Sequence, residues 1–125
     1  FTGMQPSDRV AALLKQADVF SLASYHFDNQ PMTFLEAASS GLPIVYCDEQ
    51  MTEGLTERNS VLADGIEGED LARAFNGLFS DPKRLERLSL GSLDVARDFD
   101  STTMAERMVD LYESLIRDHR ALPYR

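Results

Sequence analysis

A nearly continuous apolar run, LPIVYCD at 42–48, is the feature that most limits the possible folds of this chain. Such a run is typical of a strand covered on both faces, which occurs in parallel sheets flanked by helices. A helical segment from Pro31 to Gly41 precedes it, and before that comes a second apolar run with β-branched and aromatic residues at 18–24. Strand, helix and strand in this order predict a parallel α/β sheet.

Further elements extend this pattern on both sides. A helix is expected over about 7–17 with Ser7 as its N-cap, and SVLA at 60–63 is a weak third strand. From residue 67 onward the pattern is helical, with a break at Asp81-Pro82 and a cap at Asp100 or Ser101. We therefore predict a partial, Rossmann-like parallel sheet of about three strands flanked by helices, where five or six strands are usual.

Two expectations concern the packing of these late helices. Gly91 is expected to weaken the second of them, because glycine is a poor helix former. The last helix carries an apolar stripe at helical spacing, which we expect to be part of the core. Its members are Met104, Met108, Leu111, Tyr112 and Leu115.

Charge and cysteine content exclude several classes of protein. The formal net charge of −9 and the pI near 4.5 argue against a nucleic-acid partner or a basic membrane-binding face. No apolar run approaches the roughly 20 residues of a membrane-spanning helix. The single cysteine, Cys47, cannot build a disulfide framework and is expected to be interior packing, which suits a cytoplasmic protein.

The start of the helix at 31–40 favours an anion. The backbone N–H groups of Met32 and Thr33 lack intrahelical partners, and the helix dipole adds roughly half a positive charge there. Pro31 fixes the entry of the chain, and the polar loop at 25–30 lies at the carboxyl end of a strand, where open parallel sheets bind ligands.

Two carboxylates flank this anion site, with seven residues between them: Asp28 in the loop and Glu36 in the helix. Glu36 lies about 7 Å further along the helix axis than Pro31, so the pair suits an extended ligand with diols at two places and negative charge between them. A sugar nucleotide has this form. The alternatives are a solvated helix residue for Glu36 and a cap for Asp28, but Glu36 stands in a run that is too apolar for us to expect an exposed face. His26 is either a ligand contact or a solvated loop residue.

A family resemblance rests on several motifs. The chain from Phe1 to Tyr112 resembles the C-terminal half of the C-terminal domain of retaining GT-B glycosyltransferases of family 4, also called group 1. The matching segments are Phe1-Thr2-Gly3, Leu13-Leu14 with Ala17-Asp18, the strand from Val19 to Ser24, DNQPMTFLEAASSGLPIV from Asp28, and GEDLARAFNGLFSDPKRLERL from Gly68.

The resemblance implies a sugar-nucleotide donor site, with Glu36 and Asp28 as its catalytic carboxylates. Glu36 would hold the ribose hydroxyls, and Asp28 would contact hydroxyls of the transferred sugar, although it replaces the family's usual glutamate with a side chain one methylene shorter. The residues that would approach the sugar and the diphosphate are Gln30, Pro31, Met32 and Thr33. No metal and no cofactor is implied beyond the donor, a UDP- or GDP-sugar.

The resemblance also implies that 1–125 is one partial domain that lacks its N-terminal portion. The acceptor, a lipid, a polysaccharide or another molecule, would bind the missing N-terminal domain, and the fragment would be inactive alone. The full enzyme would be cytoplasmic or peripherally membrane-associated. In the family, the Arg and Lys that bind the phosphates come from an earlier part of this domain, which the resemblance implies is missing here. The basic residues Arg73, Lys83, Arg84 and Arg87 lie on the late helices and are expected to be far from the site.

Two other functions remain open. One is a glycosidase that uses Asp28 and Glu36 as its carboxylate pair, which would need the two groups across one bond. The other is a non-catalytic α/β module that binds a nucleotide or a partner. If missing strands normally cover one edge of the three-stranded sheet, that edge is exposed in this chain and favours self-association, so a homodimer or a larger species is expected.

Overall fold

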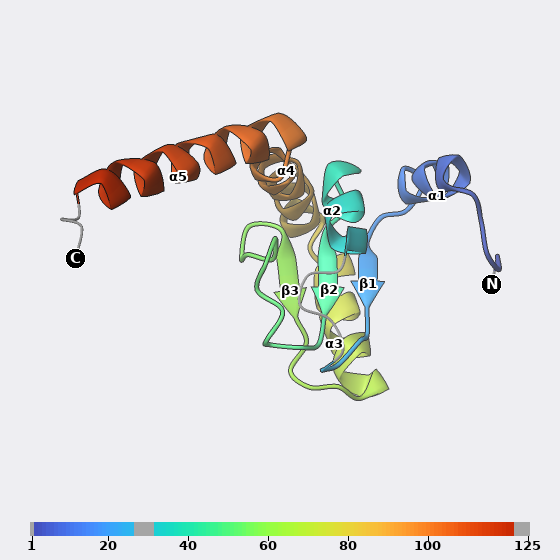
Figure 1. The fold of residues 1–125 in the computed structure, drawn as a ribbon. Helices are drawn as coiled ribbons and strands as arrows, with labels where there is room; N and C mark the ends of the chain where they lie inside the picture. Colours follow the sequence, from blue (N-terminus) through green and yellow to red (C-terminus); the bar gives the residue numbers. More distant parts are fainter. Residues whose placement is uncertain (1, 27–31, 122–125) are drawn as a thin grey trace.

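The computed structural model describes residues 2–26 and 32–121 (Figure 1). Within these residues, three strands and five helices follow one another in the predicted order, which is helix, strand, helix, two strands and then three helices. Their bounds are α1 (Ser7–Leu14), β1 (Phe20–Leu22), α2 (Met32–Ser39), β2 (Ile44–Tyr46), β3 (Ser60–Leu62), α3 (Gly68–Phe79), α4 (Pro82–Asp98) and α5 (Ser101–Ala121).

The strands form one parallel sheet in the order β1-β2-β3. Ile44 in β2 is paired with Phe20 on one side and with Ser60 on the other, so β2 is the central strand. All three carboxyl ends therefore lie at the same edge of the sheet (Figure 1). This confirms the predicted α/β class and the three-stranded parallel sheet.

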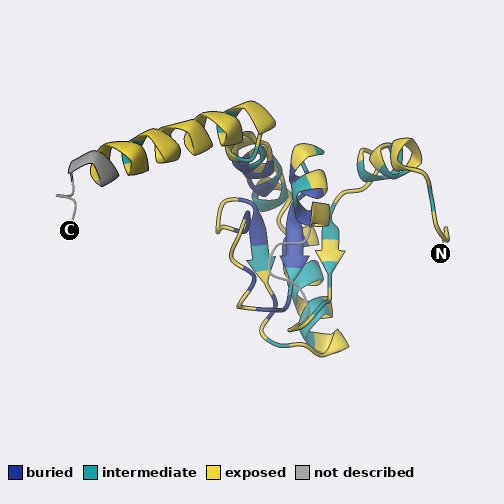
Figure 2. Ribbon diagram, in the orientation of Figure 1, coloured by how far each residue is buried: buried dark blue, intermediate teal, exposed yellow. Residues whose placement is uncertain are grey.

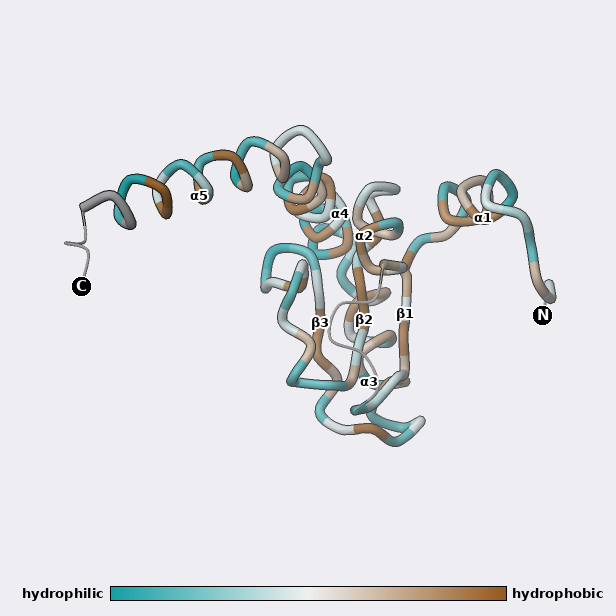
Figure 3. Tube along the Cα trace, viewed as in Figure 1, coloured by the Kyte–Doolittle hydropathy of each residue, from teal (hydrophilic) through white to brown (hydrophobic). Residues whose placement is uncertain are grey.

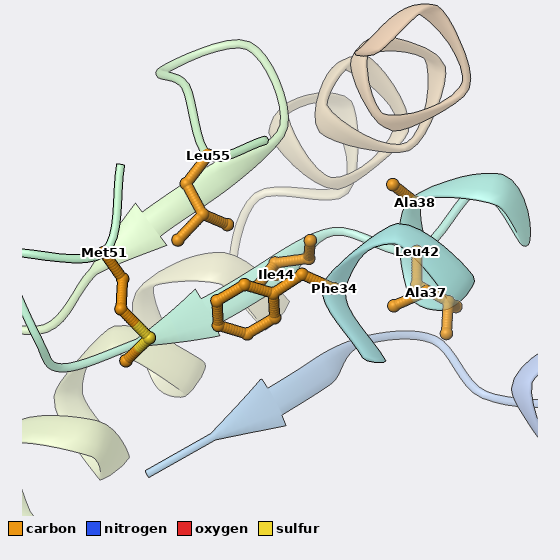
Figure 4. Close-up of a cluster of buried hydrophobic side chains, with 7 residues drawn as sticks. All are labelled: Phe34, Ala37, Ala38, Leu42, Ile44, Met51 and Leu55. Carbon is orange, nitrogen blue, oxygen red and sulfur yellow. The ribbon is translucent and has the colours of Figure 1, made fainter. Parts of the chain in front are cut away.

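Helices cover both faces of this sheet. Successive side chains of a strand point to opposite faces, so neighbouring residues of β2 pack against different helices. Ile44 packs with Phe34 of α2 in one buried cluster, which also contains Ala37, Leu42, Met51 and Leu55 (Figure 4). Val45, the next residue of β2, packs with Leu78 of α3 and Leu88 of α4 in a second cluster. Figure 2 shows how the burial concentrates at β2, which explains why the 42–48 run is so uniformly apolar.

Most of the predicted helices and strands are longer than the observed ones. The expected helix over 7–17 ends at Leu14, since Gln16 and Ala17 donate to the carbonyls only three residues back. Ser7 is the first helical residue and Pro6 is the N-cap, so the expected Ser7 cap is wrong. The strands keep only the three residues that form ladder bonds. By contrast, Asp100 does cap α5, since its carboxylate accepts the N–H of Thr102 at 2.7 Å.

The apolar stripe of α5 is not part of the core, contrary to expectation. The helix extends away from the sheet layers (Figure 1), and hydrophobic residues recur along it in Figure 3. The stripe side chains are between 43% and 57% exposed to solvent. The helical period correctly identified an apolar face, but no described part of the chain covers it. The exposed members are Met104, Met108, Leu111, Tyr112 and Leu115.

Candidate functional site

The two faces of α2 divide its residues between core and solvent. Phe34, Ala37 and Ala38 are buried against the sheet, and Ala37 and Ala38 are fully so. Glu36 lies on the opposite side and is exposed, as are Met32 and Thr33. The expectation that Glu36 stands in a run too apolar for an exposed face is therefore wrong. At 3.6 residues per turn, the apolar neighbours occupy the other face of the same helix.

The exposed side of α2 lines a cavity of about 740 Å³ that α1 closes on its other side. Its walls include apolar side chains from both helices, such as Leu14 and Leu35, and Phe99 from the turn before α5. The polar residues that line it are Gln5, Ser7, Lys15, Thr33, Glu36, Ser39 and Ser40. The cavity therefore offers a carboxylate, an ammonium group and hydroxyl groups beside an apolar wall.

The structure thus brings together three of the predicted site residues. Met32, Thr33 and Glu36 all contribute to this cavity, and the first turn of α2 contains no acidic side chain. The N–H groups of the first turn of a helix lack intrahelical partners, so an anion site at the start of α2 stays a prediction. The other three predicted residues, Asp28, Gln30 and Pro31, lie outside the described residues. The contribution of α1 was not anticipated, because it depends on a contact between helices that are distant in sequence.

The carboxyl ends of β1 and β2 are joined by a buried carboxylate that sequence reasoning missed. Asp48 follows β2 and is 1% exposed. Its Oδ2 accepts the backbone N–H of His26 at 2.7 Å, and its Oδ1 accepts that of Gln50 at 3.0 Å. These two bonds, the first above all, lower the pKa of Asp48 and keep it ionised. The only hint in the sequence was that this aspartate comes directly after the most apolar strand.

Cys47 has the buried position expected of a packing residue. Its Sγ lies 3.8 Å from the carbonyl oxygen of Ser24, the acceptor of its weak hydrogen bond. Burial raises the pKa of the Cys47 thiol, and the charge of Asp48 raises it further. The thiol is thus protonated at neutral pH and poorly nucleophilic.

The charged groups elsewhere suggest neither a metal centre nor a second anion site. Within 2–26 and 32–121, no three His, Cys, Asp or Glu side chains are grouped closely enough to hold a metal ion. Arg73 is paired with Asp70 and Asp64 on the surface, away from the cavity between α1 and α2. None of the helices in the described chain has the length and apolar character needed to cross a membrane.

Comparison with known proteins gives a consistent result. Residues 1–91 match the family model described as glycosyl transferases group 1. The chain is 30% identical over 114 residues to N,N'-diacetylbacillosaminyl-diphospho-undecaprenol alpha-1,3-N-acetylgalactosaminyltransferase of Campylobacter jejuni, covering 87% of this chain and 29% of that protein. It is 29% identical over 122 residues to D-inositol 3-phosphate glycosyltransferase of Salinispora tropica, covering 96% of this chain and 25% of the relative.

Two further similarities agree with these. Alpha-galactosylglucosyldiacylglycerol synthase of Streptococcus pneumoniae is 29% identical over 113 residues, which are 90% of this chain and 29% of the relative. Among solved structures, sucrose-phosphate synthase from Thermosynechococcus elongatus superimposes with a TM-score of 0.76 at 20% identity, covering 94% of this chain and 30% of that one. The chain therefore spans less than a third of the length of the relatives it matches.

Proposed function

The chain belongs to the glycosyl transferases group 1 family, and from this premise we propose that it is the donor-binding part of a retaining hexosyltransferase. The donor is a UDP- or GDP-sugar, and this segment is the later part of the C-terminal domain. The acceptor binds an N-terminal domain outside this chain, so the chain alone is inactive. The family also removes the glycosidase alternative, because its members transfer sugars. The other alternative, a non-catalytic nucleotide-binding module, describes how the isolated chain would behave.

One observation carries this proposal: Glu36 and the exposed start of α2 line the same large cavity. In this arrangement the Glu36 carboxylate accepts hydrogen bonds from the two ribose hydroxyls. The apolar wall between α1 and α2 accommodates the base. The diphosphate lies at the N-terminus of α2, where the helix dipole and the N–H groups of Met32 and Thr33 favour negative charge. Gln30 and Pro31 precede this turn in sequence and approach the sugar.

The reaction needs no metal and no cofactor under this proposal, because the donor brings its own leaving group. The relatives' names support a lipid or small polar acceptor. One relative is named for a diphospho-undecaprenol compound, another for a diacylglycerol product and a third for inositol 3-phosphate. A cytoplasmic enzyme that works at a membrane surface would reach such acceptors. A homodimer through the outer edge of β1 or β3 stays a prediction.

Glu36→Ala is expected to weaken the binding of UDP or GDP by about 10–100-fold, the equivalent of one or two charge-assisted hydrogen bonds. Calorimetric titration of the 125-residue chain with UDP, GDP and their glucose and mannose derivatives measures this loss. Glu106→Ala, an exposed glutamate of α5, is the matched control and should bind like the wild type. Unchanged nucleotide affinity in Glu36→Ala would refute the ribose role.

Asp28→Ala is expected to act on the sugar rather than on the nucleotide. The affinity for the preferred sugar nucleotide should fall by about tenfold, and that for bare UDP or GDP should change by less than about twofold, because only the sugar hydroxyls lose an acceptor. The same titrations give both values. Equal losses for the two ligands would exclude a sugar-specific role of Asp28.

A further inference from the structure

The wall that α1 contributes to the cavity is one face of that helix. Ser7, Val10, Ala11 and Leu14 line the cavity, at the spacing of residues that share a helix face. Most of these side chains are apolar, so this wall can pack against a flat ring but offers it few hydrogen bonds. Gln5 lines the same cavity just before α1 and adds an amide group to this wall.

The Gln5 side chain is restricted by its neighbours in sequence. Its Nε2 donates to the backbone carbonyl oxygen of Thr2 at 2.6 Å. Gly3, between the two residues, has a φ of +65°, a left-handed conformation that suits glycine. Pro6 follows directly as the N-cap of α1 and disfavours helical backbone at Gln5. The half-buried amide is therefore oriented before any ligand arrives.

The bond to Thr2 determines which atom of the amide is free for a ligand. A carbonyl oxygen can only accept, so the nitrogen of the Gln5 amide must be the atom on the Thr2 side. The opposite orientation would place two acceptors against each other. The other branch of the amide, Oε1, has no hydrogen-bond partner in the part of the chain that the structure describes. Gln5 therefore offers an acceptor.

A fixed acceptor distinguishes nucleobases by their ring nitrogens. Uracil has a ring N–H at N3 and guanine has one at N1, whereas adenine has a lone pair at N1. Proteins read such base edges through hydrogen bonds. A group placed to accept from an N–H disfavours an analogue that lacks it, because the protein acceptor is then left unpaired and faces a second lone pair.

The two walls of the cavity give the nucleoside a direction. Glu36 lies on the α2 side and Gln5 on the α1 side of the same cavity. A nucleoside held by its ribose at Glu36 extends its base toward the apolar face of α1. The edge of the base is its polar part, and Gln5 is the amide that this side of the cavity offers to it.

We propose that Gln5 determines the base specificity of the donor site: its Oε1 accepts the ring N–H of uracil or guanine and thereby disfavours adenine. This inference rests on the proposed function, since it takes the ribose position at Glu36 from it.

Gln5→Met tests the proposal in the 125-residue chain, because methionine has an unbranched side chain of similar length without the amide. Calorimetric titration with UDP, GDP and ADP gives the affinities. In the wild type, ADP should bind at least about tenfold more weakly than the better of UDP and GDP. Gln5→Met should lower the affinity for that better ligand by about tenfold and that for ADP by less than about twofold.

Gln16→Met is the matched control. Gln16 is an exposed glutamine just after α1 and is not among the residues that line the cavity. The same substitution there should leave all three affinities unchanged. A loss in Gln16→Met equal to that in Gln5→Met would mean that the effect does not arise in the cavity, and would overturn the proposal.

A change in the ligand tests the same hydrogen bond from the other side. Methylation at N3 of UDP, or at N1 of GDP, removes the ring N–H. The methylated form of the preferred nucleotide should bind the wild type about tenfold more weakly than its parent, and Gln5→Met should bind the two with affinities within about twofold of each other. An equal effect of methylation in both proteins would exclude Gln5 as the acceptor.

Glu36→Ala in the same titrations separates this inference from the proposed function. It should weaken all three nucleotides alike, because they share the ribose. If it does so while Gln5→Met leaves the base preference unchanged, the proposed function stands and the role of Gln5 is refuted. A wild-type chain that binds UDP, GDP and ADP equally well also refutes that role. A wild-type chain that binds none of them rejects the proposed function and the inference with it.

Discussion

Alanine in place of Phe34 is expected to lower the free energy of unfolding by about 3–5 kcal/mol, which is a large part of the stability of a domain this size. The Phe34 side chain is 1% exposed and lies between α2 and the sheet (Figure 4). Its ring meets those of Phe20 and Tyr46 edge-on, with centroids 6.1 and 6.4 Å apart. Truncation removes these contacts and leaves a cavity that α2 cannot fill without moving. Urea denaturation followed by circular dichroism measures the change.

Phe79→Ala is the control for this substitution. Phe79, at the end of α3, is 54% exposed and stacks on Phe75 with ring centroids 6.1 Å apart. Its removal should cost about 1 kcal/mol, because one aromatic contact is lost without forming a buried cavity. Equal costs for the two variants would mean that Phe34 does not hold α2 on the sheet. The comparison also concerns function, because the helix that Phe34 anchors presents Glu36 to the candidate donor site.

The elements that could be predicted are those whose signals are local. The 42–48 run, the glycine at 41 and the Asp81-Pro82 pair each indicate a strand or a helix end from a few neighbouring residues. The structure agrees: Gly41, two residues after the end of α2, has a φ of +75°, and the Asp81 carboxylate accepts the N–H of Arg84 at 3.0 Å at the start of α4. The parallel arrangement followed from the alternation of strands and helices, which leaves few topologies.

The errors concern contacts between distant parts of the chain. The sequence shows that a helix has an apolar face but not what packs against that face. The stripe of α5 was therefore predicted to be core, although it is exposed. Glu36 was predicted to be enclosed because its neighbours in sequence are apolar, but these neighbours point to the other side of α2. Asp48 was missed because its partner His26 is 22 positions away, and no local pattern distinguishes a buried aspartate from a solvated one.

Gly91 also shows that local sequence does not reveal contacts with distant residues. Its substitution is the second change for which we expect a large effect on stability. By helix propensity this glycine weakens α4, and alanine should stabilise the helix by about 1 kcal/mol. In the structure, however, a Cβ at position 91 would lie 2.0 Å from the carbonyl oxygen of Arg58. The adjacent Ser92 is buried and donates its hydroxyl to the carbonyl of Leu42 at 2.6 Å, so α4 cannot easily withdraw. Gly91→Ala is therefore expected to destabilise the protein by about 3 kcal/mol, at the upper end of over-packing costs.

Gly77 in α3 separates the two contributions, because it is also a helical glycine but has free space around it. A Cβ at this position would meet no atom of the described chain within 4 Å. Gly77→Ala should therefore raise the free energy of unfolding by about 0.5–1 kcal/mol, through the conformational entropy of the unfolded chain. Denaturation of both variants under the same conditions gives the two values, and opposite signs are expected. If both alanines stabilise the protein, α4 does not approach the Arg58 carbonyl as closely as described, and propensity alone governs this helix.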